Sequence, residues 1–145
     1  MVKVKKKIKI LIIGGTGFIG KNLSLKCLNL GWNVSALHLK KYNKKNLLSK
    51  VKYIRGDISK ISDLKKIKTN FDFVVNCGGY VDHINKDKVF KYQNTGCKNL
   101  TKIFSKKKIK LFLQIGSGAE YGKSKSPHHE RIICNPRSNY GKAKF

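Results

Sequence analysis

Residues 9–20 constrain the fold of this chain more than any other stretch, because an apolar run leads directly into closely spaced glycines. The stretch reads KILIIGGTGFIG and contains the spacing Gly15-x-Gly17-x-x-Gly20, preceded by Gly14. This spacing supplies a tight turn, a position without Cβ where the backbone approaches a pyrophosphate, and a small residue where a helix packs on a strand. It predicts a strand, turn and helix that bind nucleotide phosphates. An ordinary turn between strand and helix is the alternative.

The helix that follows strengthens the binding interpretation. If it begins near Phe18, its unpaired N–H groups and the positive end of its dipole are directed at the phosphates. An apolar run before the glycines and a helical apolar pattern after them are the context that this motif requires. The predicted dinucleotide contacts of the turn are Gly14, Gly15, Thr16, Gly17, Phe18, Ile19 and Gly20.

The chain is strongly basic, with 33 Lys and Arg against seven Asp and Glu in 145 residues and a formal net charge of +26. Such a charge favours binding to polyanions at low salt. However, only three of the basic residues are Arg, and the lysines are spread from Lys3 to Lys144. Proteins that read nucleic acids concentrate their basic residues and favour Arg. We therefore predict no specific nucleic-acid partner and keep a polyanion-binding protein as an alternative.

The cysteines and apolar runs limit the class of protein further. The four cysteines are far apart and form no Cys-x-x-Cys pair, so we expect reduced thiols, no metal site and a cytoplasmic protein. No apolar run approaches the length of a membrane span, so no membrane association is predicted.

Four further apolar segments follow the first strand, with helical patterns between them. The segments cover residues 33–39, 51–58, 71–79 and 109–115. A long helix is predicted over residues 86–104, and a shorter one holds Leu64 and Ile67, with Ser59 or Ser62 as its cap. Strands that alternate with helices favour a parallel sheet covered on both faces. We predict an α/β fold with a Rossmann-like, doubly wound parallel sheet.

The end of the second strand bears on the choice of dinucleotide. An acid that binds the ribose 2′-hydroxyl is normal there, about 20 residues past the glycines. This chain has His38 instead, followed by Lys40 and Lys41. Basic groups suit a 2′-phosphate, so NADP is slightly favoured over NAD. A solvated lysine loop is the alternative.

Two later strand ends are also predicted to contact the dinucleotide. Asp57 and Ile58 follow the third strand, where a carboxylate can accept a hydrogen bond from the adenine amino group. Asp57 can equally be an ordinary turn or capping residue. Gly78 and Gly79 follow the fourth strand and permit close approach of the backbone, or simply interrupt a loop.

The last third of the chain adds Ser117, four residues before Tyr121, and the pair Tyr140-x-x-x-Lys144. Together with the glycine turn and the other strand ends, these residues make the whole chain resemble the extended short-chain dehydrogenase/reductase family. Within that family, the chain resembles the branch of nucleotide-sugar epimerases, dehydratases and reductases. The markers of this resemblance are GGTGFIG at 14–20, GDI at 56–58, NCGG at 76–79, Ser117 with Tyr121-Gly122, and Tyr140 with Lys144.

The resemblance implies a catalytic role for Ser117, Tyr140 and Lys144. Residues four apart on a helix share a face, and an ammonium favours the ionised form of a nearby phenol, whose ordinary pKa is about 10. Tyr140 is then the acid and base toward a sugar hydroxyl, while Lys144 holds the nicotinamide ribose and Ser117 binds the substrate oxygen. The implied reaction is hydride transfer between a sugar carbon of a nucleotide sugar and NAD or NADP.

The chain departs from this branch at several positions. Ala119 precedes Glu120 where dehydratases have an Asp that protonates the leaving hydroxyl, which favours keto-sugar reduction or epimerisation over dehydration. Gln93 and Cys97 replace the Asn and Thr of a helix motif. The segment 128–130, His-His-Glu, is predicted to be a solvated loop, because no further metal ligand accompanies it.

The position of Lys144 also shapes the expectation for activity. Relatives are about twice this length, within the multi-element scale of nucleotide-binding enzymes. We expect residues 1–145 to be a NAD(P)-binding Rossmann domain that is incomplete at its C-terminus, lacks the substrate lobe and is inactive alone. The resemblance further implies a homodimer. A noncatalytic dinucleotide-binding domain is the remaining alternative.

Overall fold

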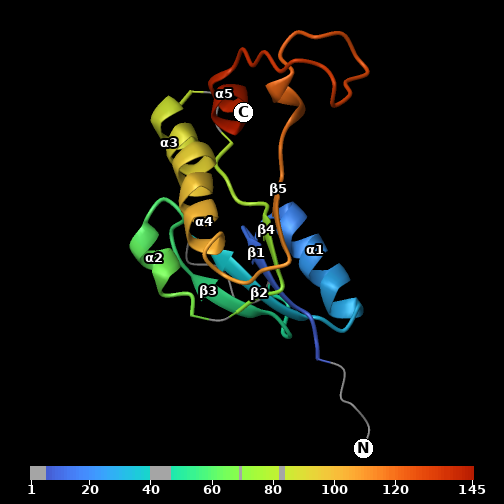
Figure 1. Cartoon of the computed structure of the whole chain (residues 1–145), viewed down its shortest axis with the longest axis vertical. Helices are drawn as coiled ribbons and strands as arrows, with labels where there is room; N and C mark the ends of the chain where they lie inside the picture. The colour runs from blue at the N-terminus through green and yellow to red at the C-terminus, as the bar shows by residue number, and fades with distance from the viewer. Residues whose placement is uncertain (1–5, 40–46, 69, 82–83) are drawn as a thin grey trace, which may run out of the picture.

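A computed structural model describes residues 6–39, 47–68, 70–81 and 84–145 (Figure 1). Its centre is a five-stranded sheet with the order β3-β2-β1-β4-β5, in which every neighbouring pair is parallel. The strands are β1 Lys9–Ile13, β2 Asn33–His38, β3 Lys52–Arg55, β4 Phe73–Asn76 and β5 Leu111–Gln114. The predicted Rossmann-like parallel sheet is confirmed, and its switch point lies between β1 and β4.

Helices cover both faces of this sheet. Figure 1 shows α1 on one face, and α2 and α4 on the other. The helical elements are α1 Phe18–Asn29, α2 Ile61–Lys65, α3 Lys86–Phe90, η2 Lys91–Thr95, α4 Gly96–Phe104, η3 Gly118–Glu120 and α5 Asn139–Lys144. Among the described residues, none of these helices has the length and apolar character needed to cross a membrane.

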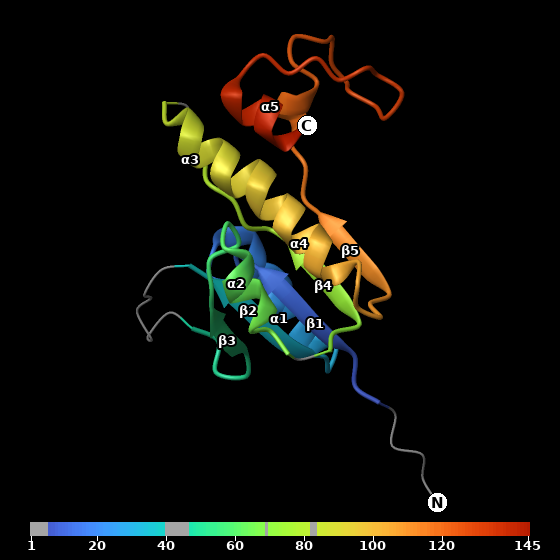
Figure 2. The same cartoon turned by 60° about the vertical axis from the view of Figure 1, so that its left-hand side comes forward.

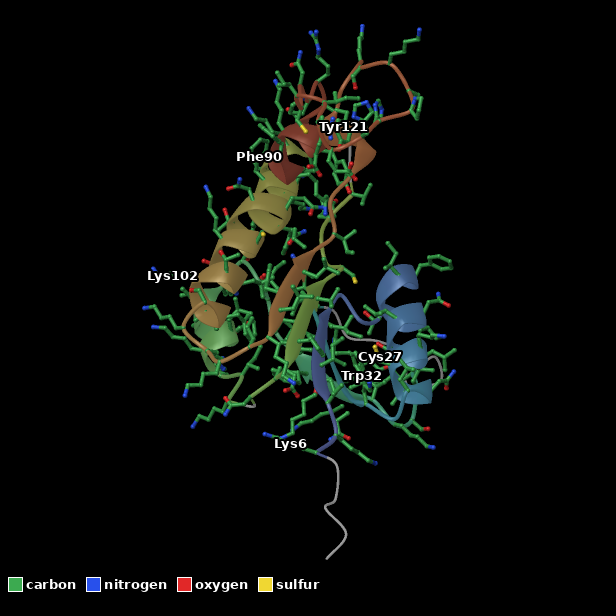
Figure 3. All side chains as sticks on the ribbon, turned by 45° about the vertical axis from the view of Figure 1, so that its right-hand side comes forward. Lys6, Cys27, Trp32, Phe90, Lys102 and Tyr121 are labelled. Carbon is green, nitrogen blue, oxygen red and sulfur yellow. The ribbon has the colours of Figure 1, made fainter. Side chains whose placement is uncertain are left out.

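The side chains of β1 alternate between two apolar clusters. Ile10 and Ile12 pack on the α1 side together with Cys27, which Figure 3 shows between α1 and the sheet. Leu11 and Ile13 pack on the opposite side in a cluster that includes Phe104. Because successive residues of a strand point to opposite faces, a strand buried on both faces requires an uninterrupted apolar sequence. This requirement explains the run that opens the chain.

The predicted long helix at residues 86–104 is present as one continuous helical run, with a π-helical turn at its centre (Figure 2). The strands predicted at 33–39, 51–58, 71–79 and 109–115 are present but shorter at one or both ends. The predicted Ser cap of α2 is wrong. The N-cap is Lys60, which makes no side-chain cap, and Ile67 lies beyond the end of the helix. Ser59 donates to Asp57 Oδ1 instead, both from its main-chain N–H at 2.9 Å and from its Oγ at 2.7 Å.

Asp72 ties the start of β4 to β1 and makes stability depend on pH. Its Oδ2 accepts a hydrogen bond from the Lys9 main-chain N–H at 2.9 Å, and its Oδ1 lies 3.4 Å from Lys110 Nζ. The main-chain bond, more than Lys110, lowers the pKa of Asp72. A carboxylate whose pKa is lowered by folding stabilises the fold above its unfolded pKa of about 4, and this stabilisation is lost as the pH falls through the lower folded value.

We therefore expect Asp72→Asn to be less stable than the parent chain at about pH 6, and the two to converge as the pH approaches about 2. Urea denaturation at a series of pH values measures this difference. A stability difference that stays constant over the range would contradict the assignment.

Candidate functional site

The glycine turn leaves the carboxyl end of β1 at the switch point of the sheet. Gly14 has φ +72°, and its N–H donates to Leu37 O at 2.8 Å, which anchors the turn to β2. The N–H of Gly17 donates to Gly14 O at 2.9 Å and closes the turn. Ligands of open α/β sheets bind outside the carboxyl ends of the strands at this point.

A cleft of about 310 Å³ opens beside this turn, where β1 and β4 diverge. Gly14 and Gly17 form one wall, and Gly78 and Gly79 form another. Predicted contact residues that line the cleft are Gly14, Thr16, Gly17, His38, Ile58, Gly78 and Gly79. The other predicted positions lie outside the lining: Gly15 is in the turn itself, and Phe18, Ile19 and Gly20 are the first residues of α1.

The turn fits a dinucleotide by its lack of side chains. A Cβ at Gly14 would lie 2.7 Å from Gly78 Cα, so the two loops approach more closely than side chains allow. A Cβ at Gly17 would have a single close neighbour, Gly14 O at 3.3 Å. Gly17 is also the N-cap of α1 and supplies no side-chain cap, and the first turn contains no acid. The helix N-terminus is thus open to an anion such as a pyrophosphate.

Two of the residues predicted to select the dinucleotide, His38 and Asp57, lie in different environments. His38 ends β2, is 6% exposed and lines the cleft. Lys40, together with Lys41, lies outside the described residues. Asp57 is outside the lining, and its Oδ1 accepts both hydrogen bonds from Ser59, which is the arrangement of a turn residue.

Beyond β5, helix α5 brings Tyr140 and Lys144 to the same end of the sheet. Lys144 Nζ donates to Ile115 O at 2.8 Å and lies 6.0 Å from the centre of the Tyr140 ring. Burial lowers the pKa of Lys144, and Glu120 opposes this shift. The ammonium is therefore fixed on a main-chain carbonyl beside the phenol, and neither residue is part of the cleft lining.

Ser117 begins the short helix η3 and forms a capping box with Glu120. The Ser117 Oγ accepts from Ala119 N at 3.2 Å, while Glu120 Oε1 accepts from Ser117 N at 2.6 Å. Helix α5 packs closely on η3, because Gly141 leaves no Cβ next to the Ala119 carbonyl. The carboxylate of Glu120 thus has a structural role in holding this turn.

A polar network next to Lys144 was not predicted from the sequence. Gln114 Oε1 accepts from Asn76 Nδ2 at 2.7 Å and from Cys97 Sγ at 3.2 Å, while Gln114 Nε2 donates to Ile115 O at 2.9 Å. Asn76 Oδ1 in turn accepts from Gly78 N at 3.0 Å. The side chains of Gln114 and Asn76 thereby connect the carbonyl of Ile115 to the loop of Gly78.

Gln93 and the histidine loop complete the surroundings of the site. Gln93, one of the unusual residues, is 5% exposed in the π-helical turn, and its Nε2 donates to Tyr80 O at 3.3 Å. His128 stacks on Tyr121 with 4.8 Å between ring centres and bonds to Ser124 Oγ at 3.1 Å. Within the described residues, no group of three or more His, Cys, Asp or Glu is arranged to hold a metal.

Comparison with known proteins supports this reading of the fold. Residues 10–145 match the model of the NAD dependent epimerase/dehydratase family. Two proteins of Pisum sativum are similar over 94% of this chain: a bifunctional UDP-glucose 4-epimerase and UDP-xylose 4-epimerase at 28% identity, and a UDP-glucose 4-epimerase at 27%. The chain spans 45% of the length of each of these relatives, which is less than half.

Solved structures are similar over nearly the whole chain. The enzyme WbmG of Bordetella bronchiseptica, in complex with NAD, matches with a TM-score of 0.86 at 23% identity, over 99% of this chain and 49% of that one. ADP-L-glycero-D-manno-heptose-6-epimerase of Helicobacter pylori matches with a TM-score of 0.84 at 27% identity, over 99% and 51%. The first likeness concerns the fold alone.

Proposed function

This chain belongs to the NAD dependent epimerase/dehydratase family, and from that premise we propose that residues 1–145 are the NAD(P)-binding domain of a nucleotide-sugar oxidoreductase or epimerase. The observation that carries the proposal is the glycine-walled cleft at the switch point of the sheet, with the N-terminus of α1 open toward it. This combination is what a pyrophosphate requires from a protein backbone.

The dinucleotide would be held mainly by main-chain groups. Gly14–Gly20 would bind the pyrophosphate, while the backbone of Gly78 and Gly79 would line the β4 side of the site. Ile58 and His38 would contact the adenosine half, and Asp57 would accept a hydrogen bond from the adenine amino group. When bound, the dinucleotide supplies hydride transfer, and the protein supplies position and charge.

Three side chains would handle the proton and the substrate. Tyr140 would exchange a proton with a sugar hydroxyl, because the Lys144 ammonium nearby favours the ionised phenol. Lys144 would also bind the ribose hydroxyls of the dinucleotide with the donors left after its bond to Ile115 O. Ser117 would bind the reacting oxygen of the substrate through its hydroxyl.

Epimerisation or keto-sugar reduction is proposed in preference to dehydration. Dehydration needs a proton donor for the leaving hydroxyl, and Ala119 cannot supply one. The neighbouring Glu120 already accepts the Ser117 N–H in the capping box. The acid in this turn is therefore committed to structure, which supports the two reactions that need only a proton exchange by Tyr140.

The choice between NAD and NADP stays a prediction. The slight preference for NADP depended on His38 and Lys40, and Lys40 lies outside the described residues. The family description and the NAD complex of the Bordetella bronchiseptica enzyme favour NAD instead. NAD is accordingly the first dinucleotide to test.

We also propose that these residues alone bind dinucleotide without converting a sugar. The curated relatives are more than twice as long as the part matched here, since that part is 45% of their length. The nucleotide-sugar partner and a homodimer belong to the same proposal. Reduction of a keto-sugar nucleotide by the 145-residue chain would contradict it.

Dinucleotide binding is tested by calorimetry with NADH and NADPH on the parent chain and on Gly17→Ala. We expect the parent to bind and the variant to bind about tenfold more weakly, because the added methyl group enters the cleft where the backbone would meet the pyrophosphate. The Cβ would have one close neighbour, Gly14 O at 3.3 Å, so a shift of a few tenths of an ångström in the turn accommodates it.

Gly118→Ala is the matched control, because a Cβ at Gly118 has no neighbour within 4 Å and the residue is outside the cleft lining. Equal affinities for both variants, or no binding of either dinucleotide to the parent, would overturn the proposal. In a longer form of the enzyme, Tyr140→Phe should keep this affinity and lose hydride exchange. A noncatalytic binding domain would show no exchange even with Tyr140.

A further inference from the structure

A second concave surface lies at the opposite end of the sheet from the dinucleotide cleft. It has a volume of about 280 Å³ and is formed by Lys9, Asn33 and Lys52 at the amino ends of β1, β2 and β3, together with neighbouring residues. In Figure 1 this is the end of the sheet where the chain enters β1. Nothing in the proposed function uses this surface.

The strand register brings the lysines together on one face. Lys9 pairs with Asn33, and two residues further along β2, Ser35 pairs with Lys52. Side chains two apart on a strand share a face, and neighbouring strands are about 4.8 Å apart. Lys9 and Lys52 therefore flank the same part of β2, and Lys50, just before β3, lines the same cavity.

The floor of this basic groove is built from buried residues. Phe71 is 3% exposed, Val34 4% and Ser35 7%, whereas Lys50, Lys52 and Asn33 are exposed. The groove thus has a buried floor of two apolar residues and one serine, and exposed lysines are among its other lining residues. A lysine stem can lie along apolar surface while its ammonium group reaches a ligand.

Among the described residues that line the groove, none is an acid. The adjacent Asp72 is engaged elsewhere, with Oδ2 on the Lys9 main-chain N–H and Oδ1 at 3.4 Å from Lys110 Nζ. In the described parts of the chain, the ion pairs join Lys66 to Asp63 and Lys110 to Asp72, and neither involves a groove lysine.

We propose that this groove, formed by Lys9, Lys50 and Lys52 over Ser35 and Phe71, binds a compact oligophosphate. Three lysines that line one cavity match a ligand with several negative charges in a small volume, and lysines bind phosphate as point charges. An extended nucleic-acid backbone requires a track of charges instead. The inference does not depend on dinucleotide binding, because the groove and the cleft are at opposite ends of the sheet.

The test uses inorganic tripolyphosphate and the complete chain. Calorimetry gives the affinity of the parent, of Lys9→Gln/Lys50→Gln/Lys52→Gln, and of the control Lys26→Gln/Lys98→Gln/Lys106→Gln. Both triple variants lose the same charge, and the control lysines are exposed helix or loop residues outside the groove. We expect about tenfold weaker binding in the groove variant and less than about twofold in the control.

Amide chemical shifts of the unsubstituted chain locate the ligand independently of any variant. We expect tripolyphosphate to shift the signals of Lys9, Ser35 and Lys52 and to leave those of Gly14–Gly20 unchanged. Equal weakening in both triple variants would mean diffuse attraction and would overturn the proposal. Shifts confined to Gly14–Gly20 would overturn it too. So would a single-stranded oligonucleotide that binds Lys9, Ser35 and Lys52 more tightly than tripolyphosphate does.

Discussion

Replacement of Gly20 by alanine is expected to lower the free energy of unfolding by about 2 kcal/mol. Helix propensity alone predicts the opposite, a stabilisation of about 1 kcal/mol, because Gly20 lies inside α1. Steric overlap decides the sign. A Cβ at this position would lie 2.8 Å from Gly15 Cα and 2.9 Å from the Gly14 carbonyl carbon, and both are backbone atoms of a tight turn that cannot rotate away.

Urea denaturation of Gly20→Ala and Gly17→Ala measures the effect, and the two variants differ only in where the methyl group is placed. Gly17→Ala should cost less, about 1 kcal/mol or below, because its methyl group meets a single atom at 3.3 Å and alanine replaces glycine at the N-cap. If Gly20→Ala were as stable as the parent, α1 would not be packed against the glycine turn. The site would then lose the geometry from which dinucleotide binding was inferred.

The turn at residues 14–20 shows why this part of the site could be predicted from the sequence. Gly14 has a positive φ, Gly20 allows the helix to contact the turn, and Gly17 leaves an open position. The glycines that these three conditions require therefore all lie within seven consecutive residues. The parallel sheet and the helix at residues 86–104 were predictable for a similar reason. Apolar runs and their spacing are local signals, and parallel connections admit few topologies.

Contacts between distant segments could not be predicted in this way. The cap of α2 is Lys60, because Ser59 turns its hydroxyl to Asp57, and the sequence alone does not choose between these bonds. The basic groove depends on register, since Lys9 and Lys52 are 43 positions apart in the printed sequence. The π-helical turn at Lys91–Thr95 likewise has no pattern that distinguishes it from an α-helix.

The Asn76–Gln114 pair did carry a signal that could have been found. Asn76 ends the apolar strand FVVN, and Gln114 ends the apolar strand LFLQ. Neighbouring parallel strands place such ends side by side. The observed register pairs these two residues directly. A polar residue at the end of one buried strand therefore predicts a polar partner at the end of the next, because a buried amide needs a hydrogen bond.

This pair leads to the second large effect. Gln114→Leu is expected to lower the free energy of unfolding by about 2 kcal/mol, because Asn76 is 1% exposed and its Nδ2 would lose its acceptor in a buried place. The affinity for NADH should fall as well. Asn76 Oδ1 holds the N–H of Gly78 in the cleft wall, and an Asn76 side chain that turns away to find another partner releases that loop.

A double-mutant cycle separates this pair from general damage to the core. Asn76→Leu alone should also destabilise the chain, whereas Asn76→Leu/Gln114→Leu should cost less than the sum of the two changes by about 1 kcal/mol or more, since neither partner is then left unsatisfied. Cys97→Ala, which removes the weaker thiol donor to Gln114, should have the smaller effect of a single methyl-sized core change. Strictly additive losses in the cycle would contradict direct coupling between Asn76 and Gln114, and Gly78 would then need another anchor.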